Sequence, residues 1–250
     1  MAILTTRDGE IIAQDPGKTI LQLVTEHKDD LTYANLSDLD LRGLDLSGAC
    51  LDQADLSGSD LSGAIMTGTD MRGAMCRGTL LEGADMTRAR LGDSDLTYAH
   101  AARVTLTDAD LSGVDMYGAD LAGAAMMGAD MTGASLHSTD LTGADMTLAS
   151  LRSAVMAGTG LEGALLDGAV LEDAWLDGAY APDAEFRGAH LTGARLANCD
   201  LSGVDLRDAD LSGATLRGAD LTGADLDGAT LPTPAPETPA AGTDTPGIGI

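Results

Sequence analysis

The sequence predicts a β-solenoid, in which the chain winds into stacked coils around a narrow interior. Three observations carry this prediction. A large apolar residue recurs every five residues from Leu36 to Leu231 without a shift of frame, and 36 of these 40 central positions are Leu or Met. The residue two before the centre is Ala in 28 of 40 copies, and the residue two after it is Gly in 25 of 39. Aromatic residues, which dominate the core energetics of many globular domains, make up only 2% of the chain.

The five-residue period excludes the two common regular structures. A helix repeats every 3.6 residues and a strand every two, so neither places all the central residues on one side. Glycine in every fifth position would also cost a helix about 1 kcal/mol per copy. A chain that bends at each Gly and extends between the bends meets the pattern, with Asp bonding backbone groups in the corners. The backbone groups of such a chain pair with the coils above and below.

The repeated motifs resemble those of the pentapeptide repeat proteins. Gly-Ala-Asp-Leu at 118–121, Leu-Ser-Gly-Ala at 61–64 and Met-Thr-Gly-Ala at 131–134 carry this resemblance, which covers residues 31–231. It implies an all-β fold, a right-handed quadrilateral parallel β-helix with four pentapeptides per coil. The central and small residues would point inward, and the other three positions would face solvent. Forty copies then make about ten coils and a rod roughly 48 Å long.

Residues 1–30 precede the repeat and are predicted to cap its first coil. Ala2–Leu4 and Ile11–Ile12 flank an Asp8–Gly9 turn, which is typical of a β-hairpin. Asp15–Pro16 then opens a short helix. An open solenoid end exposes unpaired backbone groups, and we expect the hairpin and the helix to cover them.

Residues 232–250 contain five prolines and no periodic apolar residues, which predicts a flexible tail. The sequence shows no second cap for the last coil, near Leu226 and Leu231. Pairing of two rods through this C-terminal coil, as a homodimer, is therefore a hypothesis that the sequence raises.

The composition limits the ligands and the compartment. The chain has 40 acidic and 14 basic residues, a formal net charge of −26. This charge would repel phosphates, so we expect no direct nucleic-acid ligand and favour cationic partners. We find no run of about 18 apolar residues and no signal peptide, and we therefore expect no membrane association and a cytoplasmic location. Cys50, Cys76 and Cys199 fall far apart in the predicted coils, so no disulfide is expected.

No catalytic or metal-binding motif stands out. None of the four histidines lies within a helix turn of another histidine or a cysteine, so the sequence contains no local zinc motif. Paired carboxylates occur throughout because the repeat itself contains Asp, and no pair is distinguished as an acid and a base. We therefore expect a non-enzyme without a cofactor.

Stacked aspartates are one candidate binding feature. If each coil has twenty residues, outward positions twenty apart stack at about 4.8 Å. One interpretation is that each Asp only bonds the backbone groups of its own corner. The other is that the stacked aspartates form ladders that imitate a phosphate backbone. Residues 31–231 carry 32 acids and 11 Arg, which gives about 0.4 charge per ångström against about 0.6 for duplex DNA. The stacked pairs are Asp110 and Asp130, Asp120 and Asp140, Asp200 and Asp220, and Asp205 and Asp225.

The family resemblance gives these ladders a specific meaning. Some pentapeptide repeat proteins are DNA mimics that occupy the DNA-binding saddle of gyrase and protect it from quinolones. This chain is similar to them in repeat, length and charge. It departs from them because no loop interrupts the coils and no helix follows the last coil.

The second candidate feature is a gap in the Asp column between residues 155 and 195. Apolar and aromatic residues replace Asp there, and the only Trp of the chain lies among them. Exposed aromatic patches with a charged rim are typical of protein-binding sites, and Trp175 would stack between Val155 and Arg195. The apolar and aromatic residues of this gap would wind around just over one coil as an exposed apolar belt. The alternatives are that the repeat tolerates stray apolar residues, or that the belt rigidifies a weak coil near Ala181–Pro182. The candidate belt residues are Val155, Leu165, Val170, Trp175, Tyr180 and Arg195.

A weaker departure spans residues 88–108, where five successive turn positions lack Gly and arginines gather. One interpretation is that these changes compensate for a coil whose interior is poorly filled. The other is that they form a second contact surface. The sequence thus favours an acidic rod that binds another protein, through the belt or through the acidic faces. A gyrase-binding DNA mimic is the alternative, and a structural spacer or assembly component is a third. The sequence does not name the partner.

Overall fold

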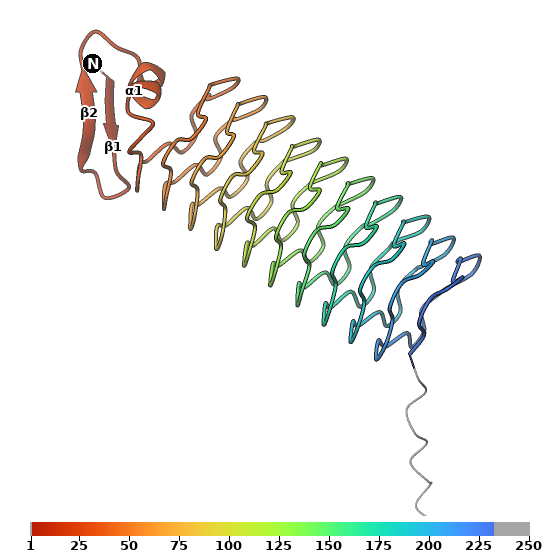
Figure 1. Ribbon diagram of the computed structural model, residues 1–250. Helices are drawn as coiled ribbons and strands as arrows, with labels where there is room; N and C mark the ends of the chain where they lie inside the picture. The colour runs from red at the N-terminus through yellow and green to blue at the C-terminus, as the bar shows by residue number, and fades with distance from the viewer. Residues whose placement is uncertain (1, 233–250) are drawn as a thin grey trace, which may run out of the picture.

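A computed structural model describes residues 2–232 and shows a rod with one capped end (Figure 1). Strands β1 (Ala2–Thr5) and β2 (Ile11–Asp15) form an antiparallel hairpin, and helix α1 (Ile20–Glu26) follows. The helix begins later than Asp15–Pro16 predicts, because Asp15 still pairs with Ala2 in the hairpin. Thr19 caps the helix, and its side chain and that of Gln22 form a capping box.

From Asn35 onward the backbone pairs in parallel with the residue twenty positions later, from Asn35 with Asp55 to Asp210 with Thr230. Twenty residues are four pentapeptides, so every coil has four sides. We number the sides in chain order by their central residues. The first side contains the pentapeptides centred on Leu36 and on every twentieth residue to Leu216; the second, third and fourth sides begin at Leu41, Leu46 and Leu51.

The interior is filled as the repeat predicts. The central Leu and Met side chains from Leu36 to Leu211 are buried, together with the small residues two positions before them. Where a hydroxyl replaces Ala inside, it usually donates to a carbonyl of the preceding coil, as Thr139 Oγ1 does to the Met116 oxygen at 2.8 Å. Such a bond removes most of the cost of burying the hydroxyl.

The corners are the strained part of the backbone. Every turn residue from Asp38 to Gly228 has a positive φ, which Gly adopts without steric cost. The five consecutive turn residues without Gly keep the same geometry, with φ between +55° and +58°. Each of these L-residues costs roughly 1–2 kcal/mol relative to a right-handed conformation. They are Arg88, Asp93, Tyr98, Arg103 and Asp108.

The two ends of the described rod differ. At the N-terminal end, Leu23 and Val24 of α1 are buried together with Leu4 and Leu31. At the other end Leu216, Leu221 and Leu226 are only half-buried, and Leu231 is 51% exposed. Within residues 2–232, no segment covers the last coil, and the Pro-rich tail falls outside the described residues except for Pro232. None of the helices in this described part is long and apolar enough to cross a membrane.

Candidate protein-binding surfaces

The outward aspartates are hydrogen-bonded within their own corners. In each, Oδ1 accepts from the backbone N–H two residues later, as Asp110 does from Ser112 at 3.1 Å. The predicted pairs do stack twenty residues apart. One oxygen of each carboxylate is therefore used by the turn, and the other oxygen is left for ion pairs or solvent. The eight acidic candidates all make this bond, at 2.9–3.1 Å: Asp110, Asp120, Asp130, Asp140, Asp200, Asp205, Asp220 and Asp225.

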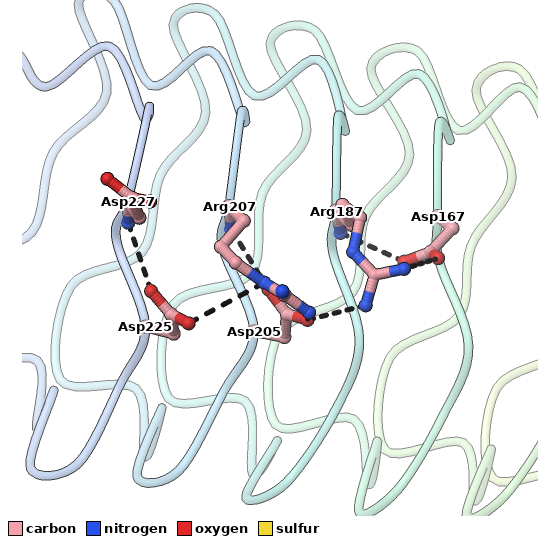
Figure 2. Close-up of polar contacts among 6 residues, drawn as sticks. All are labelled: Asp167, Arg187, Asp205, Arg207, Asp225 and Asp227. Atoms are coloured by element: carbon pink, nitrogen blue, oxygen red, sulfur yellow. Dashed lines mark hydrogen bonds and ion pairs between the residues drawn. The ribbon is translucent and has the colours of Figure 1, made fainter.

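On the third side, arginines connect these carboxylates along the rod (Figure 2). Asp205 Oδ2 lies 2.8 Å from Arg187 Nη2 and 2.5 Å from Arg207 Nη2. The hydrogen bond from the Arg207 side chain, followed by that from Arg187, holds the pKa of Asp205 well below its usual range. Arg207 Nε continues the ladder at 3.5 Å from Asp225, and Arg187 Nη1 extends it the other way, 3.7 Å from Asp167.

The candidate belt residues wind around the rod, as their five-residue spacing predicts. They fall on all four sides of the rod, because each successive pentapeptide occupies the next side. Only Val155, Trp175 and Arg195 share a side and pair in sequence along it. Tyr180, 49% exposed, lies on the second side. Leu165 is on the third side and Val170 on the fourth, and both are half-buried.

Trp175, Asp177 and Arg195 form a compact group on the first side, here called the Trp175 cluster. The Arg195 guanidinium carbon lies 4.2 Å from the Trp175 ring centroid, so the predicted cation–π contact is present. Asp177 Oδ2 pairs with Arg195, and its Oδ1 accepts from the Ala197 N–H at 3.0 Å. In many corners an Asp at the position equivalent to Arg195 accepts this N–H. Asp177 accepts it instead, and it also holds the Arg195 guanidinium over the Trp175 ring.

The sequence reasoning missed a second aromatic group on the same side. The Tyr98 and Tyr117 rings meet edge to face with centroids 5.6 Å apart, and His137 stacks on Tyr117 at 5.7 Å. Arg77 lies 5.1 Å above the Tyr98 ring. We call these four residues the aromatic ladder. The sequence does contain a signal for this group. Tyr98, Tyr117 and His137 are spaced by 19 and 20 residues, close to one coil, and all three lie outside the Asp column.

The cysteines and acids of the described residues give no sign of a chemical centre. Cys76 and Cys199 are buried, and burial raises the pKa of the Cys76 thiol to about 12 and that of Cys199 to about 11. All three cysteines are free thiols. Among residues 2–232 there is no group of three or more His, Cys, Asp or Glu side chains arranged to hold a metal ion.

Solved structures of other proteins resemble the chain. HetL of Nostoc sp. strain PCC 7120, a pentapeptide repeat protein involved in heterocyst differentiation regulation, is 29% identical, with 85% of this chain and 95% of HetL covered and a TM-score of 0.47. A trypsin-treated variant of QnrB1, a plasmid-mediated fluoroquinolone resistance protein, is 21% identical, with 75% and 89% covered and a TM-score of 0.49. A comparison with curated proteins finds no match.

The family itself is established by the sequence model described as "Pentapeptide repeats (8 copies)". It matches overlapping segments that run from residue 30 to residue 231, about four-fifths of the chain. This match agrees with the five-residue period, with the pairing of residues twenty apart and with a right-handed β-helix. The chain therefore belongs to the pentapeptide repeat family.

Proposed function

We propose that this chain is a non-enzymatic rod that binds another protein. The observation that carries the proposal is the Trp175 cluster, in which a 42% exposed indole is fixed by Arg195 and Asp177. Trp and Arg are the residues most enriched at the energetic centres of protein interfaces. A ring that is already held in place loses little conformational entropy when a partner covers it. The free thiols fit a reducing compartment, and we place the role in the cytoplasm.

The test is a comparison of partner binding by two variants. Trp175→Asp combined with Tyr180→Asp should weaken capture of the bound protein by at least about tenfold, since interface-centre residues are worth 2 kcal/mol or more. The matched control is Leu148→Asp, which adds a charge at a 65% exposed apolar position on the third side. Circular dichroism verifies that both variants keep the fold. Unchanged binding by the double variant would refute the role of Trp175 and Tyr180. Binding at a fixed stoichiometry, independent of both variants, would favour a structural spacer.

A second candidate is a DNA mimic that binds gyrase. It is favoured by carboxylates that stack along the rod with one oxygen of each free of the turn, and by the high negative charge of the repeat. Supercoiling by gyrase should then be inhibited as the chain is added, or be rescued from a quinolone. A mimic of this kind loses affinity steeply with salt, whereas the Trp175 cluster does not depend on charge alone. No effect at well above micromolar concentration would exclude this function.

The open C-terminal coil supports a third element of the proposal, a homodimer. Leu216, Leu221, Leu226 and Leu231 present apolar surface there, and among the described residues none covers it. Two rods that meet end to end would bury these side chains. Light scattering should give twice the monomer mass at high concentration, and Leu231→Asp should return the chain to a monomer. A wild-type monomer at high concentration would eliminate the dimer.

A further inference from the structure

The charge of the rod is distributed unequally among its four sides. Over the forty pentapeptides, the second side carries nine acidic residues and two Arg, and the third side carries ten acidic residues and three Arg. The fourth side carries eight acidic residues and three Arg. The first side carries five acids and three Arg, a net charge of −2. It lies between the second side, at −7, and the fourth side, at −5. The first side is thus a nearly neutral strip with an acidic border along both edges.

The same strip holds most of the exposed aromatic surface. Tyr98, Tyr117 and Trp175 are 47%, 40% and 42% exposed, and all three lie on the first side. Of the remaining exposed aromatic side chains, Tyr180 lies on the second side and Tyr33 lies beside the N-terminal hairpin, under Arg7. Depletion of charge together with enrichment in Tyr, Trp and Arg is the composition of an interface core.

The backbone of this side limits how a partner can bind. Main-chain N–H and C=O groups along the coils are hydrogen-bonded to the coils before and after. The Leu96 N–H donates to the Asp115 carbonyl at 2.7 Å, and the Asp115 N–H donates to the Ser94 carbonyl at 3.0 Å. An extended peptide therefore cannot add to the side of the rod as a new strand. A helix satisfies its own backbone and offers one apolar stripe. From Arg77 to Arg195 the strip extends over six coil spacings, about 29 Å, and 18 helical residues are about 27 Å long.

We propose that the first side is the docking surface for an amphipathic helix of a partner protein, with an apolar seam and Lys or Arg on both flanks. The seam would cover the aromatic ladder and the Trp175 cluster. The basic flanks would face the acidic second and fourth sides, where charge complementarity fixes the orientation. This inference rests on the proposed protein-binding function and names the chemistry of the partner.

The test uses synthetic helices as probes for the full chain. The first is an 18-residue peptide with a Leu and Phe seam and Lys and Arg flanks; the second has the same seam with Glu flanks. Neither contains Trp, so the fluorescence of Trp175 reports on the rod alone. The double variant Tyr98→Asp with Tyr117→Asp disrupts the first side. Its matched control is Met127→Asp with Leu148→Asp, which also adds two charges at exposed apolar positions, but on the acidic third side.

We expect the basic peptide to bind wild type and to alter Trp175 fluorescence. Its Kd should be at least tenfold higher for the Tyr98 and Tyr117 double variant, and less than twofold higher for the Met127 and Leu148 control. The Glu-flanked peptide should not bind. Equal losses in both variants would mean that net charge alone attracts the peptide, and that would overturn the proposal. So would failure of the basic peptide to bind wild type. If Trp175→Asp abolishes binding of natural partners and the Tyr98 and Tyr117 changes do not, the protein-binding function is supported. That result would refute the role of the aromatic ladder in docking a helix.

Discussion

The first and third sides of the rod share one backbone and one kind of core, yet their outward side chains make different contacts. On the third side, carboxylates bond to their own turns and to arginines of neighbouring coils, as Asp205 does with Arg187 and Arg207. On the first side, aromatic rings and guanidinium groups stack from coil to coil. The β-helix therefore needs its interior and its corners to be correct, and it tolerates two quite different chemistries outside.

The comparison also shows how an outward position becomes free for recognition. At the corner after Arg195 the turn N–H of Ala197 is accepted by Asp177, one coil earlier. The same arrangement occurs on the third side, where Asp167 accepts from the N–H of Arg187 at 2.9 Å. A carboxylate from the preceding coil accepts the turn N–H in both cases. The position before the centre, often Asp, can therefore carry a side chain that contacts a partner.

The largest predicted effect is a loss of stability at acid pH. Hydrogen-bonded carboxylates with lowered pKa values lie on the second, third and fourth sides, and Asp205 is the example on the third side. Hydrogen bonds from the Arg42 side chain lower the pKa of Asp40 to about 2, and those from Ser212 and Thr222 lower the pKa values of Asp210 and Asp220. The unfolded chain, with Asp pKa values near 3.9, then binds more protons than the folded chain at acid pH. Stability from these corners is complete above about pH 5 and is lost as the pH falls from about 4 towards 2.

Far-UV circular dichroism from pH 7 to pH 2 checks this prediction. The acid transition should keep its midpoint in Tyr117→Ala, because this change removes no carboxylate. A fold that survives unchanged at pH 2 would show that the corner carboxylates contribute little.

An intermediate effect is expected at the corner beneath Tyr98. A Cβ added at Gly118, where φ is +64°, would lie 3.0 Å from Tyr98 Cε1. Gly118→Ala should therefore cost the strain of the left-handed turn, about 1–2 kcal/mol, and also displace Tyr98 from Tyr117, worth about 0.5–1.5 kcal/mol. Gly133→Ala, at φ +68° with open space around the Cβ, should cost only the strain.

Calorimetry of the two glycine variants gives the difference directly. A chain of this size loses about 2–4 °C in Tm for each kcal/mol. If Gly133→Ala is destabilised as much as Gly118→Ala, the ring contact adds nothing to stability.

The smallest effect is expected at the Trp175 cluster. Arg195→Gln removes a cation–π contact worth about 0.5–1 kcal/mol at an exposed site and an exposed ion pair of similar or smaller worth. The free energy of unfolding should fall by about 0.5–2 kcal/mol, less than for Gly118→Ala, while the emission of Trp175 shifts because its ring loses the cation. Arg152→Gln removes an ion pair with Glu172 and no cation–π contact, so it should leave the emission unchanged. Identical spectra for wild type and Arg195→Gln would contradict the stacked geometry.

The repeat made the fold predictable and the surface only partly so. A fixed period of five predicts the interior, the corners and the stacking of residues twenty apart, and from that stacking follows the contact of Trp175 with Arg195. The same period predicts that the belt residues wind around the rod, because residues five apart turn onto successive sides. The aromatic ladder was missed because Tyr98 is a turn residue, and Tyr117 and His137 follow their centres. Their contacts depend on side-chain directions that spacing along one column does not give.

The difference between the covered and the open end gives the molecule a direction of growth. Each coil contacts only its neighbours, so a coil can form once the one before it exists. During synthesis the hairpin and α1 leave the ribosome before the coils, and synthesis proceeds at about 5–20 residues per second. Each twenty-residue coil then has roughly one to four seconds to settle on a finished template before the next emerges. The rod is thus suited to being laid down in the order of translation, and its last coil is the natural starting point for unravelling.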